Sequence, residues 1–296
     1  MHLGNVHAAL LSWLSARKRG GRWLLRIEDL DRQRCRPEFT KQLLDDLRWL
    51  GMDRDGEPVF QSERDALYEN AFVELQRQGL VYGCFCRRAD LLAASAPHAA
   101  DGTPVYSGRC RALSDTERHE LSTQRPPAWR VMVGDAESAF TDGLYGPQAC
   151  KLARDVGDFV VRRADGNFAY QLAVVVDDAL TGVTEVVRGR DLLASTHQQL
   201  FLYRRLSLRP PVFRHFPLLV APDGRRLSKR DRDADMGVLR ERHSPEALIG
   251  GIMHLLGFID RNVPLSLNEA LELFSWERMP QDNITVGAAF GGQSGA

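Results

Sequence analysis

The sequence contains little that would support disulfide bonds or a membrane anchor. It has only five cysteines in 296 residues, and an odd count does not suit a disulfide framework. It has no run of about eighteen apolar residues, which a membrane-spanning helix requires, and no basic and apolar leader at its start. We therefore exclude a disulfide-stapled secreted domain, and we expect a cytoplasmic protein that makes no contact with a membrane.

An excess of charge of either sign is also missing. Lysine and arginine together number 39, as do aspartate and glutamate, so the formal net charge is zero. Overall charge therefore gives no indication of a nucleic-acid partner. Basic residues do crowd one region, and we interpret the first two of them as a solvated face: Arg204, Arg205, Arg225, Arg226, Lys229, Arg230 and Arg232.

The rest of the composition is typical of a globular protein. Hydrophobic residues make up 44% of the chain and charged residues 26%. A chain of this length can bury a sizeable core and form more than one domain.

The first 31 residues predict a helix followed by a buried strand. Apolar residues recur at near-helical spacing up to Gly20 and Gly21, which end the helix. The short apolar run Trp23–Ile27 then leads into three carboxylates, Glu28, Asp29 and Asp31. In open α/β sheets, ligands bind at the carboxyl ends of the strands.

The start of this helix is a candidate phosphate site. It opens on His2, Gly4 and Asn5, where free backbone N–H groups and the helix dipole favour an anion. Alone, such a segment is more often an ordinary helix start, and carboxylates after a strand are more often a solvated turn.

The next segments predict two helices. Pro37–Leu50 has apolar residues on one face and a glycine just after its end, and Ser62–Gly79 opens with a capping-box pattern in which Asp65 replaces the usual Glu. A strand followed by helices favours an α/β domain.

Three of the cysteines predict a metal site. Cys84 and Cys86 are one residue apart and Cys110 follows at moderate distance, which is typical of a closed structural zinc site. Zinc takes four ligands, and Tyr106 and His98 are the candidates for the fourth. The alternative is that all three are reduced, buried cysteines. Two further cysteines, Cys35 and Cys150, are isolated, and we interpret them as structural.

In the second half of the chain, the apolar runs predict several strands and helices. Trp129–Val133 predicts a strand and 140–143 a turn. Residues 158–178 predict two strands joined by a glycine turn, the second ending at Asp177 and Asp178. Three further elements follow: a strand over 184–191, a helix over 195–206 and a strand starting at His215.

The loop over 223–230 places Ser228 beside Lys229. A compact cation and a hydroxyl on a loop suit a triphosphate, although a surface loop has the same composition. Residues 244–274 predict helices with one apolar side, and the glycine-rich tail from Gly287 predicts disorder.

Taken together, six segments resemble the motifs of class I aminoacyl-tRNA synthetases of the glutamyl type, in the family's order. His2-Leu3-Gly4-Asn5 is similar to the HIGH box, Arg26–Asp31 to the RIEDTD segment, and Arg162-Arg163-x-Asp165-Gly166 to the R-R-x-D-G turn. Val174–Asp178 is similar to VVVDD, Val187-Arg188-Gly189-x-Asp191 to IRGED, and Arg226–Arg230 to the KLSKR version of KMSKS.

Within this family, the Cys84-x-Cys86…Tyr106…Cys110 pattern and the short chain resemble the glutamyl-queuosine tRNA(Asp) synthetases, which lack the anticodon-binding domain. The resemblance makes Tyr106 the fourth zinc ligand. It implies an α/β fold with a Rossmann-like doubly wound parallel sheet, an inserted zinc-containing subdomain and a C-terminal helical segment. The divisions we expect are 1–80 (first catalytic half), 81–150 (insert), 151–235 (second catalytic half), 236–286 (helical stem) and 287–296 (disordered tail).

The function implied is activation of L-glutamate by ATP, with Mg²⁺, and its transfer to the queuosine base of tRNA(Asp) by a monomer. By matching position, Glu28 would hold the ammonium group of glutamate, and Tyr170 and Arg188 its carboxyl groups, since a guanidinium fork suits a carboxylate. The residues expected to bind ATP are His2, Gly4, Asn5, Ser228 and Lys229. Of these, His2 and Lys229 are also the expected catalytic residues.

Two alternatives remain. One is a shortened glutamyl-tRNA synthetase that charges tRNA(Glu), and the other is a catalytically inactive, zinc-containing RNA-binding paralogue. In the family, a strand and loop of sequence R-F-A-P-S-P-T-G precede the HIGH box, so we expect coding sequence for them upstream of Met1.

Overall fold

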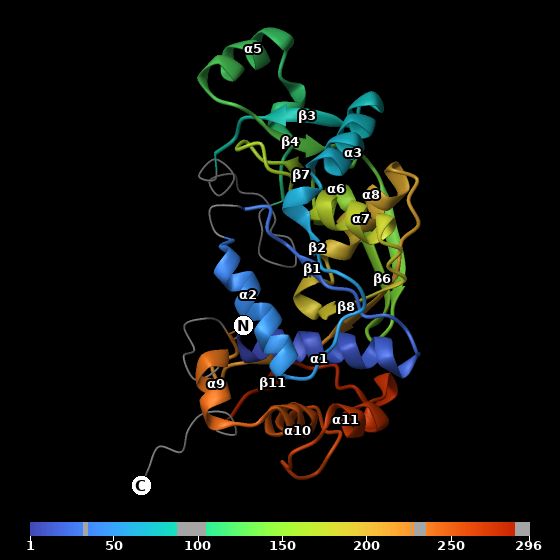
Figure 1. The fold of residues 1–296 in the computed structure, drawn as a ribbon. Coiled ribbons are helices and arrows are strands. Elements are labelled where there is room, and N and C mark those ends of the chain that lie inside the picture. Colours follow the sequence, from blue (N-terminus) through green and yellow to red (C-terminus); the bar gives the residue numbers. More distant parts are fainter. Residues whose placement is uncertain (32–34, 88–104, 226, 228–234, 288–296) are drawn as a thin grey trace.

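The computed structural model describes residues 1–31, 35–87, 105–225, 227 and 235–287, and Figure 1 shows their arrangement. Helix α1 (Leu3–Lys18) lies across the lower part of the molecule. Strand pairs and helices α7 and α8 lie on one side of it, and the C-terminal helices lie on the other. None of the helices in these ranges is long and apolar enough to cross a membrane.

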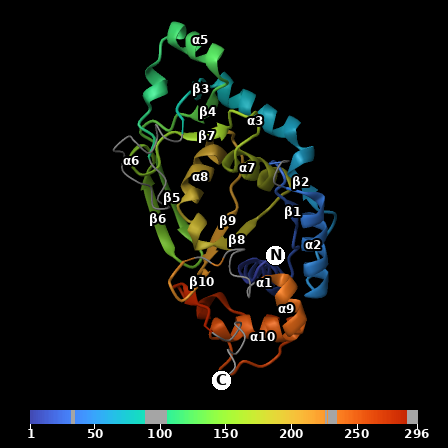
Figure 2. The same ribbon diagram turned by 90° about the vertical axis from the view of Figure 1, so that its left-hand side faces the viewer.

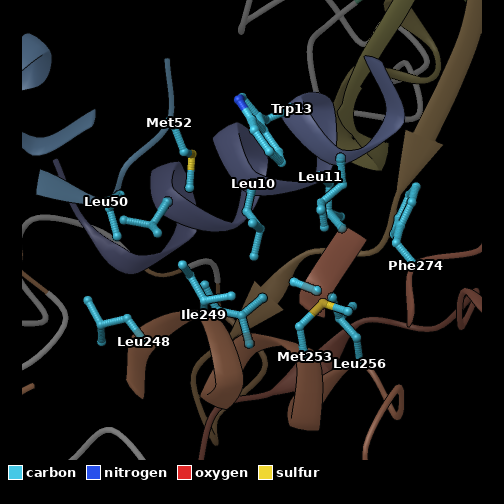
Figure 3. Close-up of a cluster of buried hydrophobic side chains, with 14 of the residues drawn as sticks. Leu10, Leu11, Trp13, Leu50, Met52, Leu248, Ile249, Met253, Leu256 and Phe274 are labelled. Atoms are coloured by element: carbon cyan, nitrogen blue, oxygen red, sulfur yellow. The ribbon is translucent and has the colours of Figure 1, made fainter. Parts of the chain in front are cut away.

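Helix α1 is buried on more than one face. Its Leu10, Leu11 and Leu14 are fully shielded from solvent. Figure 3 shows Leu10 and Leu11 pointing toward α10 (Pro245–Leu255), where they meet Ile249 and Met253. A helix covered on several sides needs apolar residues around most of its surface, which explains why the apolar spacing in this segment is only approximately helical.

The C-terminal segments complete this lower core. Met236–Arg242 forms α9, Leu267–Leu273 forms α11 and Trp276–Arg278 forms a 3₁₀ turn, η5. Serine side chains cap α10 and α11 at Ser244 and Ser266, and both helices lie within residues 244–274, for which the sequence predicts helices.

Three pairs of parallel strands make up the α/β part. β1 (Arg26–Ile27) pairs with β2 (Val59–Phe60), and α2 (Pro37–Trp49) connects them. β8 (Glu185–Gly189) pairs with β9 (Val212–Phe216), and η3 (Arg190–Leu192) and α8 (Ser195–Arg205) connect them. β10 (Leu219–Val220) pairs with β11 (Ile284–Thr285).

The strand-helix-strand connections confirm the α/β class, because parallel neighbours need such a crossover. Of the predicted doubly wound parallel sheet, the structure shows the parallel strand pairs. Across the ranges that the structure describes, the parallel strands form separate pairs and are not joined into one continuous ladder. Apolar runs in the sequence predict strands, but pairing also depends on partners that lie far away along the chain.

Antiparallel strands form the upper part of Figure 1. β3 (Val81–Cys84), β4 (Ala128–Val131) and β7 (Phe159–Arg162) make a three-stranded sheet. Two short helical turns and a helix adjoin it, η2 (Arg109–Ala112), α6 (Leu152–Asp155) and α5 (Asp115–Gln124). The sheet joins residues from both sides of the expected division at 150/151, and the proposed domain limits stay predictions.

A second antiparallel unit is the hairpin of β5 (Glu137–Asp142) and β6 (Gly146–Lys151). The prediction of a turn over 140–143 is therefore wrong, since Phe140 to Asp142 belong to β5 and the chain reverses after them. In Figure 2 this hairpin lies on one side of α8, and α7 (Tyr170–Leu180) and α3 (Asp65–Arg77) lie on the other.

Two further predictions about local structure are wrong. Val174–Asp178 is part of helix α7 and does not form a strand; all five residues are buried, and an unbroken buried run has no periodicity that separates helix from strand. Ser62 does not cap α3. It lies in η1 (Gln61–Glu63), where its hydroxyl and amide donate to Asp29 at 2.6 and 2.9 Å.

The burial of α1 generates a prediction about stability. Replacing the fully buried Leu10 by alanine should lower the free energy of unfolding by about 2–5 kcal/mol, because it removes apolar contact and leaves a cavity between α1 and α10. Urea denaturation measures this change. The matched control is Leu24→Ala, since Leu24 is 40% exposed and should cost less than about 0.5 kcal/mol. Equal losses in the two variants would contradict this assignment of the core.

Candidate active site and metal centre

The N-terminus of α1 is closed by its own side chains. The imidazole Nδ1 of His2 accepts the Gly4 amide at 3.1 Å, and the Asn5 side-chain oxygen accepts the His2 amide at 3.1 Å. A Cβ on Gly4 would lie 3.0 Å from Cε1 of the His2 ring, so a larger residue here would push the ring aside. A phosphate at this end would therefore have to replace the His2 ring as the acceptor for the Gly4 amide.

The residues that flank the predicted ATP loop lie beside this helix end. Asp235 forms an antiparallel bridge with His2, and Leu227 packs against the cluster that contains Leu3. Ser228 and Lys229 themselves, and also His98, lie outside the residues that the structure describes.

Arg26 lies on β1, and Glu28 is the residue directly after the end of this strand. The Arg26 guanidinium contacts the Glu28 carboxylate at 3.3 Å and also donates to Asp178 of α7. The Glu28 side chain remains 45% exposed, so it is held on one side and accessible on the other. An ammonium group is a suitable ligand for such a carboxylate.

Tyr170 is the first residue of α7 and is half-buried. Burial raises the pKa of its hydroxyl, and the nearby Glu28 carboxylate raises it further, while the positive charge of Arg188 opposes the shift. Tyr170 therefore lies within electrostatic reach of both other residues expected at glutamate. The fold brings together Glu28 from the residue after β1, Tyr170 from α7 and Arg188 from β8.

Arg188 lies deep in the molecule, with 8% of its surface exposed. Its Nε donates to His215 Nε2 at 3.0 Å, and its Nη2 donates to Thr196 at 2.8 Å and to the Leu192 carbonyl at 3.4 Å. His215 in turn contacts Asp142 at 2.6 Å. Burial lowers the pKa of the Arg188 guanidinium, and the neighbouring Tyr170 and Asp178 work against this shift.

Several residues around this site were missed by reasoning from the sequence. Asp142 and His215 are 73 positions apart, and the sequence predicts only a turn and the start of a strand for them. Tyr203 of α8 is also near, and its buried hydroxyl has no hydrogen-bond partner among the described residues. A polar residue inside an apolar run, such as His215 in Val-Phe-Arg-His-Phe, is the only local signal of such a role.

The three clustered cysteines do come together. The sulfur atoms of Cys84, Cys86 and Cys110 all lie within 4.8 Å of one another, an arrangement that can hold a metal ion. The Tyr106 hydroxyl is 3.5 Å from the Cys84 sulfur and 3.7 Å from the Cys86 sulfur. Ligands around a tetrahedral zinc ion lie roughly 3.5–3.8 Å apart, so these separations fit a four-ligand site.

Arg130 of β4 lies against this cluster. Its Nε donates to the Cys84 sulfur at 3.3 Å, and its guanidinium carbon lies 4.0 Å from the centre of the Tyr106 ring. Burial and the neighbouring sulfur atoms raise the pKa of Cys86 to about 12. A cation is therefore needed to make this thiol a thiolate at neutral pH, and metal binding would release its proton.

Comparison with known proteins agrees with this geometry. Residues 1–282 match the family model for tRNA synthetases class I (E and Q), catalytic domain. The Glutamyl-Q tRNA(Asp) synthetase of Symbiobacterium thermophilum is 46% identical over 97% of this chain and 93% of that protein. The protein of the same name from Nitratidesulfovibrio vulgaris is 44% identical over 95% of this chain and 90% of that protein.

A solved structure shows the same fold. The glutamate tRNA ligase of Elizabethkingia meningosepticum, in complex with its amino acid, aligns with a TM-score of 0.80 at 27% identity. The alignment covers 98% of this chain and 65% of the ligase, so this chain spans 65% of that protein's length. These matches confirm the resemblance drawn from the six motifs: the chain belongs to the class I tRNA synthetases for glutamate and glutamine, and within them to the glutamyl-Q tRNA(Asp) synthetase family.

Proposed function

We propose that this protein activates L-glutamate with ATP and transfers the glutamyl group to the queuosine base in the anticodon of tRNA(Asp). The observation that carries the proposal is that Tyr170 interacts electrostatically with both Glu28 and Arg188, so the three residues assigned to glutamate lie near one another. The names of relatives that align over nine tenths of their length support the same activity.

In the first step, a carboxylate oxygen of glutamate attacks the α-phosphorus of ATP. The new bond gives glutamyl-adenylate, and the bond to the β-phosphate oxygen breaks to release pyrophosphate. In the second step, a hydroxyl of the queuosine ring attacks the activated carbonyl, losing its proton, and AMP leaves. Such reactions need little covalent chemistry from the protein, so positioning and electrostatic stabilisation supply the rate.

Each predicted residue has a role in this scheme. Glu28 binds the substrate ammonium, and Tyr170 and Arg188 bind its carboxyl groups. His2, Gly4, Asn5, Ser228 and Lys229 bind ATP, whose phosphates are usually accompanied by Mg²⁺. His2 and Lys229 stabilise the charge that develops on the phosphates. Since the Gly4 amide donates to the His2 ring, this role requires the ring to turn when ATP binds.

A zinc ion held by Cys84, Cys86, Tyr106 and Cys110 completes the proposal. The short separations among their ligand atoms support zinc, and the hydroxyl of Tyr106 supplies an oxygen within 3.7 Å of two of the sulfurs. A closed four-ligand site stabilises structure and leaves no open position for catalysis. The expected cytoplasmic location and monomeric state stay predictions.

A second acceptor has some support. Two structural neighbours are named a glutamate tRNA ligase and a glutamate-tRNA synthetase, which supports charging of tRNA(Glu) as the alternative function. The third alternative is that the protein is a catalytically inactive, RNA-binding paralogue, and the exchange experiment below tests it.

The first prediction from the proposed function concerns glutamate activation. The protein should catalyse ATP–pyrophosphate exchange that depends on glutamate, and Glu28→Gln should raise the KM for glutamate roughly 10- to 100-fold because a charge-assisted contact of about 1.5–3 kcal/mol is lost. The KM for ATP should stay within about twofold. Glu57→Gln is the control, since that side chain is 92% exposed. If the gene encodes residues upstream of Met1, the longer chain is assayed too; no exchange by either form would refute the proposal.

The second prediction concerns the acceptor. With radiolabelled glutamate and ATP, label should enter queuosine-containing tRNA(Asp) and stay absent from tRNA(Asp) with unmodified guanosine at the same position. Incorporation into tRNA(Glu) instead would establish the alternative acceptor. Exchange activity without transfer to either tRNA would rule out both.

The third prediction concerns the metal. The purified protein should hold about one zinc per chain, and the Cys84→Ser, Cys86→Ser double variant should lose it and unfold at a lower temperature. Cys150→Ser is the matched control, because that thiol is isolated on β6. Elemental analysis and thermal melting provide the readouts. Loss of zinc in His98→Ala but not in Tyr106→Phe would overturn the choice of Tyr106, and full zinc in the double variant would refute the whole ligand set.

A further inference from the structure

Arg188 is the end of a chain of three buried groups. Asp142 at the end of β5 contacts His215 of β9 at 2.6 Å, and His215 contacts Arg188 of β8 at 3.0 Å. Asp142 and His215 have fully buried side chains, and none of the six family-like motifs contains either residue. Neither residue is among those expected to bind glutamate.

The direction of each hydrogen bond follows from Arg188. A guanidinium has only donors, so the Nε2 atom of His215 must be the acceptor of the Arg188 Nε–H. The proton of a neutral imidazole then sits on Nδ1, which donates to the carboxylate of Asp142. Asp142 also accepts the backbone amides of Leu144 and Tyr145, each at 3.0 Å. The carboxylate is therefore fixed, and it fixes both the orientation and the tautomer of the ring.

These contacts restrain one side of the guanidinium. His215 holds Nε, while Thr196 and the Leu192 carbonyl hold Nη2. The Nη1 atom donates to none of these three groups. An arginine side chain has about 2 kcal/mol of rotamer entropy, and a guanidinium fixed before binding loses less of it when a carboxylate arrives.

We propose that Asp142 and His215 are positioning residues for the proposed function, holding Arg188 so that its Nη1 side meets a carboxyl group of glutamate. The inference rests on the assignment of Arg188 to glutamate in that function. It adds that glutamate binding depends on His215 remaining neutral, which makes the site sensitive to acid.

The charges around His215 determine the sign of this effect. Asp142 faces it from β5, Arg188 from β8 and Asp191 from η3, and the Thr196 hydroxyl of α8 lies 3.4 Å from Nε2. The Phe213 ring stacks on it from the same strand. Burial lowers the pKa of His215 below its ordinary value, so the ring is neutral at pH 7. When the pH falls through that pKa, Nε2 gains a proton, loses its lone pair and places a second cation beside Arg188.

The test is the pH dependence of the KM for glutamate in the exchange reaction. For the unmodified protein, this KM should rise at least tenfold toward acid pH while the KM for ATP changes less than twofold. His215→Leu should raise the KM for glutamate tenfold or more at pH 7. His215→Gln retains an amide oxygen that can accept the hydrogen bond from Arg188, so this variant should keep most of the affinity for glutamate at pH 7. Because glutamine does not titrate, the rise in the KM for glutamate at acid pH should disappear.

A matched control is available in the same part of the molecule. His197 of α8 is also buried, its pKa is also lowered by burial, and its Nδ1 pairs with Ser138 and makes no contact with Arg188. His197→Gln should keep both the affinity for glutamate and its acid rise. Thermal melting at each pH shows whether a variant is folded, and if His215→Leu is not, His215→Gln alone decides through its pH profile.

The outcomes separate the two claims. An unmodified protein that shows no glutamate-dependent exchange overturns the proposed function and this inference with it. If exchange is present but His215→Gln retains the full acid rise in the KM for glutamate, the positioning role is wrong and the proposed function stands. If the KM for glutamate rises equally at acid pH in His215→Gln and His197→Gln, the positioning role is likewise wrong and the proposed function stands.

Discussion

Two adjacent carboxylates near the C-terminal end of α7, Asp177 and Asp178, hold the first quarter of the chain against the second half. Asp177 accepts hydrogen bonds from Gln61, Arg64 and Tyr68 at 2.6–3.0 Å, and Asp178 pairs with Arg26. Asp177 has no exposed surface, and Asp178 is 4% exposed. A buried carboxylate without partners costs roughly 3–5 kcal/mol, so these contacts cannot be lost one at a time without consequence.

The geometry of the candidate site follows from this pairing. Asp178 contacts Arg26, and Arg26 contacts Glu28, so the residue directly after β1 is oriented from the last turn of α7. Tyr170 starts the same helix, and its distance from Glu28 is therefore set by a rigid element. The site is built from charges whose partners are fixed before any ligand binds, which is the arrangement that positioning catalysis requires.

The sequence indicates candidate residues for this site, but it does not indicate which residues pair with one another across the fold. Glu28 and Arg188 could be named because they lie in motifs with fixed local spacing. Tyr170 could be named from its matching position in the family, and the three cysteines because thiols at such spacing suit zinc. The helix over Val174–Asp178 could not be recognised, because an unbroken buried run lacks any periodicity. His215 and Asp142 could not be paired, since hydrogen bonds between distant strands leave no pattern in either segment. The separate parallel pairs were missed for the same reason, because pairing is a property of distant partners.

The metal centre differs from the active site in how it is stabilised. Around α1 a large apolar cluster supplies the stability, whereas among the described residues the cluster at the cysteines contains four buried ones, Tyr82, Cys84, Tyr106 and Cys110. Three of these four are proposed ligands, so little apolar surface remains to hold β3 and η2 together. A small core of this kind usually depends on a metal or a disulfide. Metal removal should therefore loosen η2 against β3 while the cluster around α1 persists, because the two sets of buried residues have no member in common.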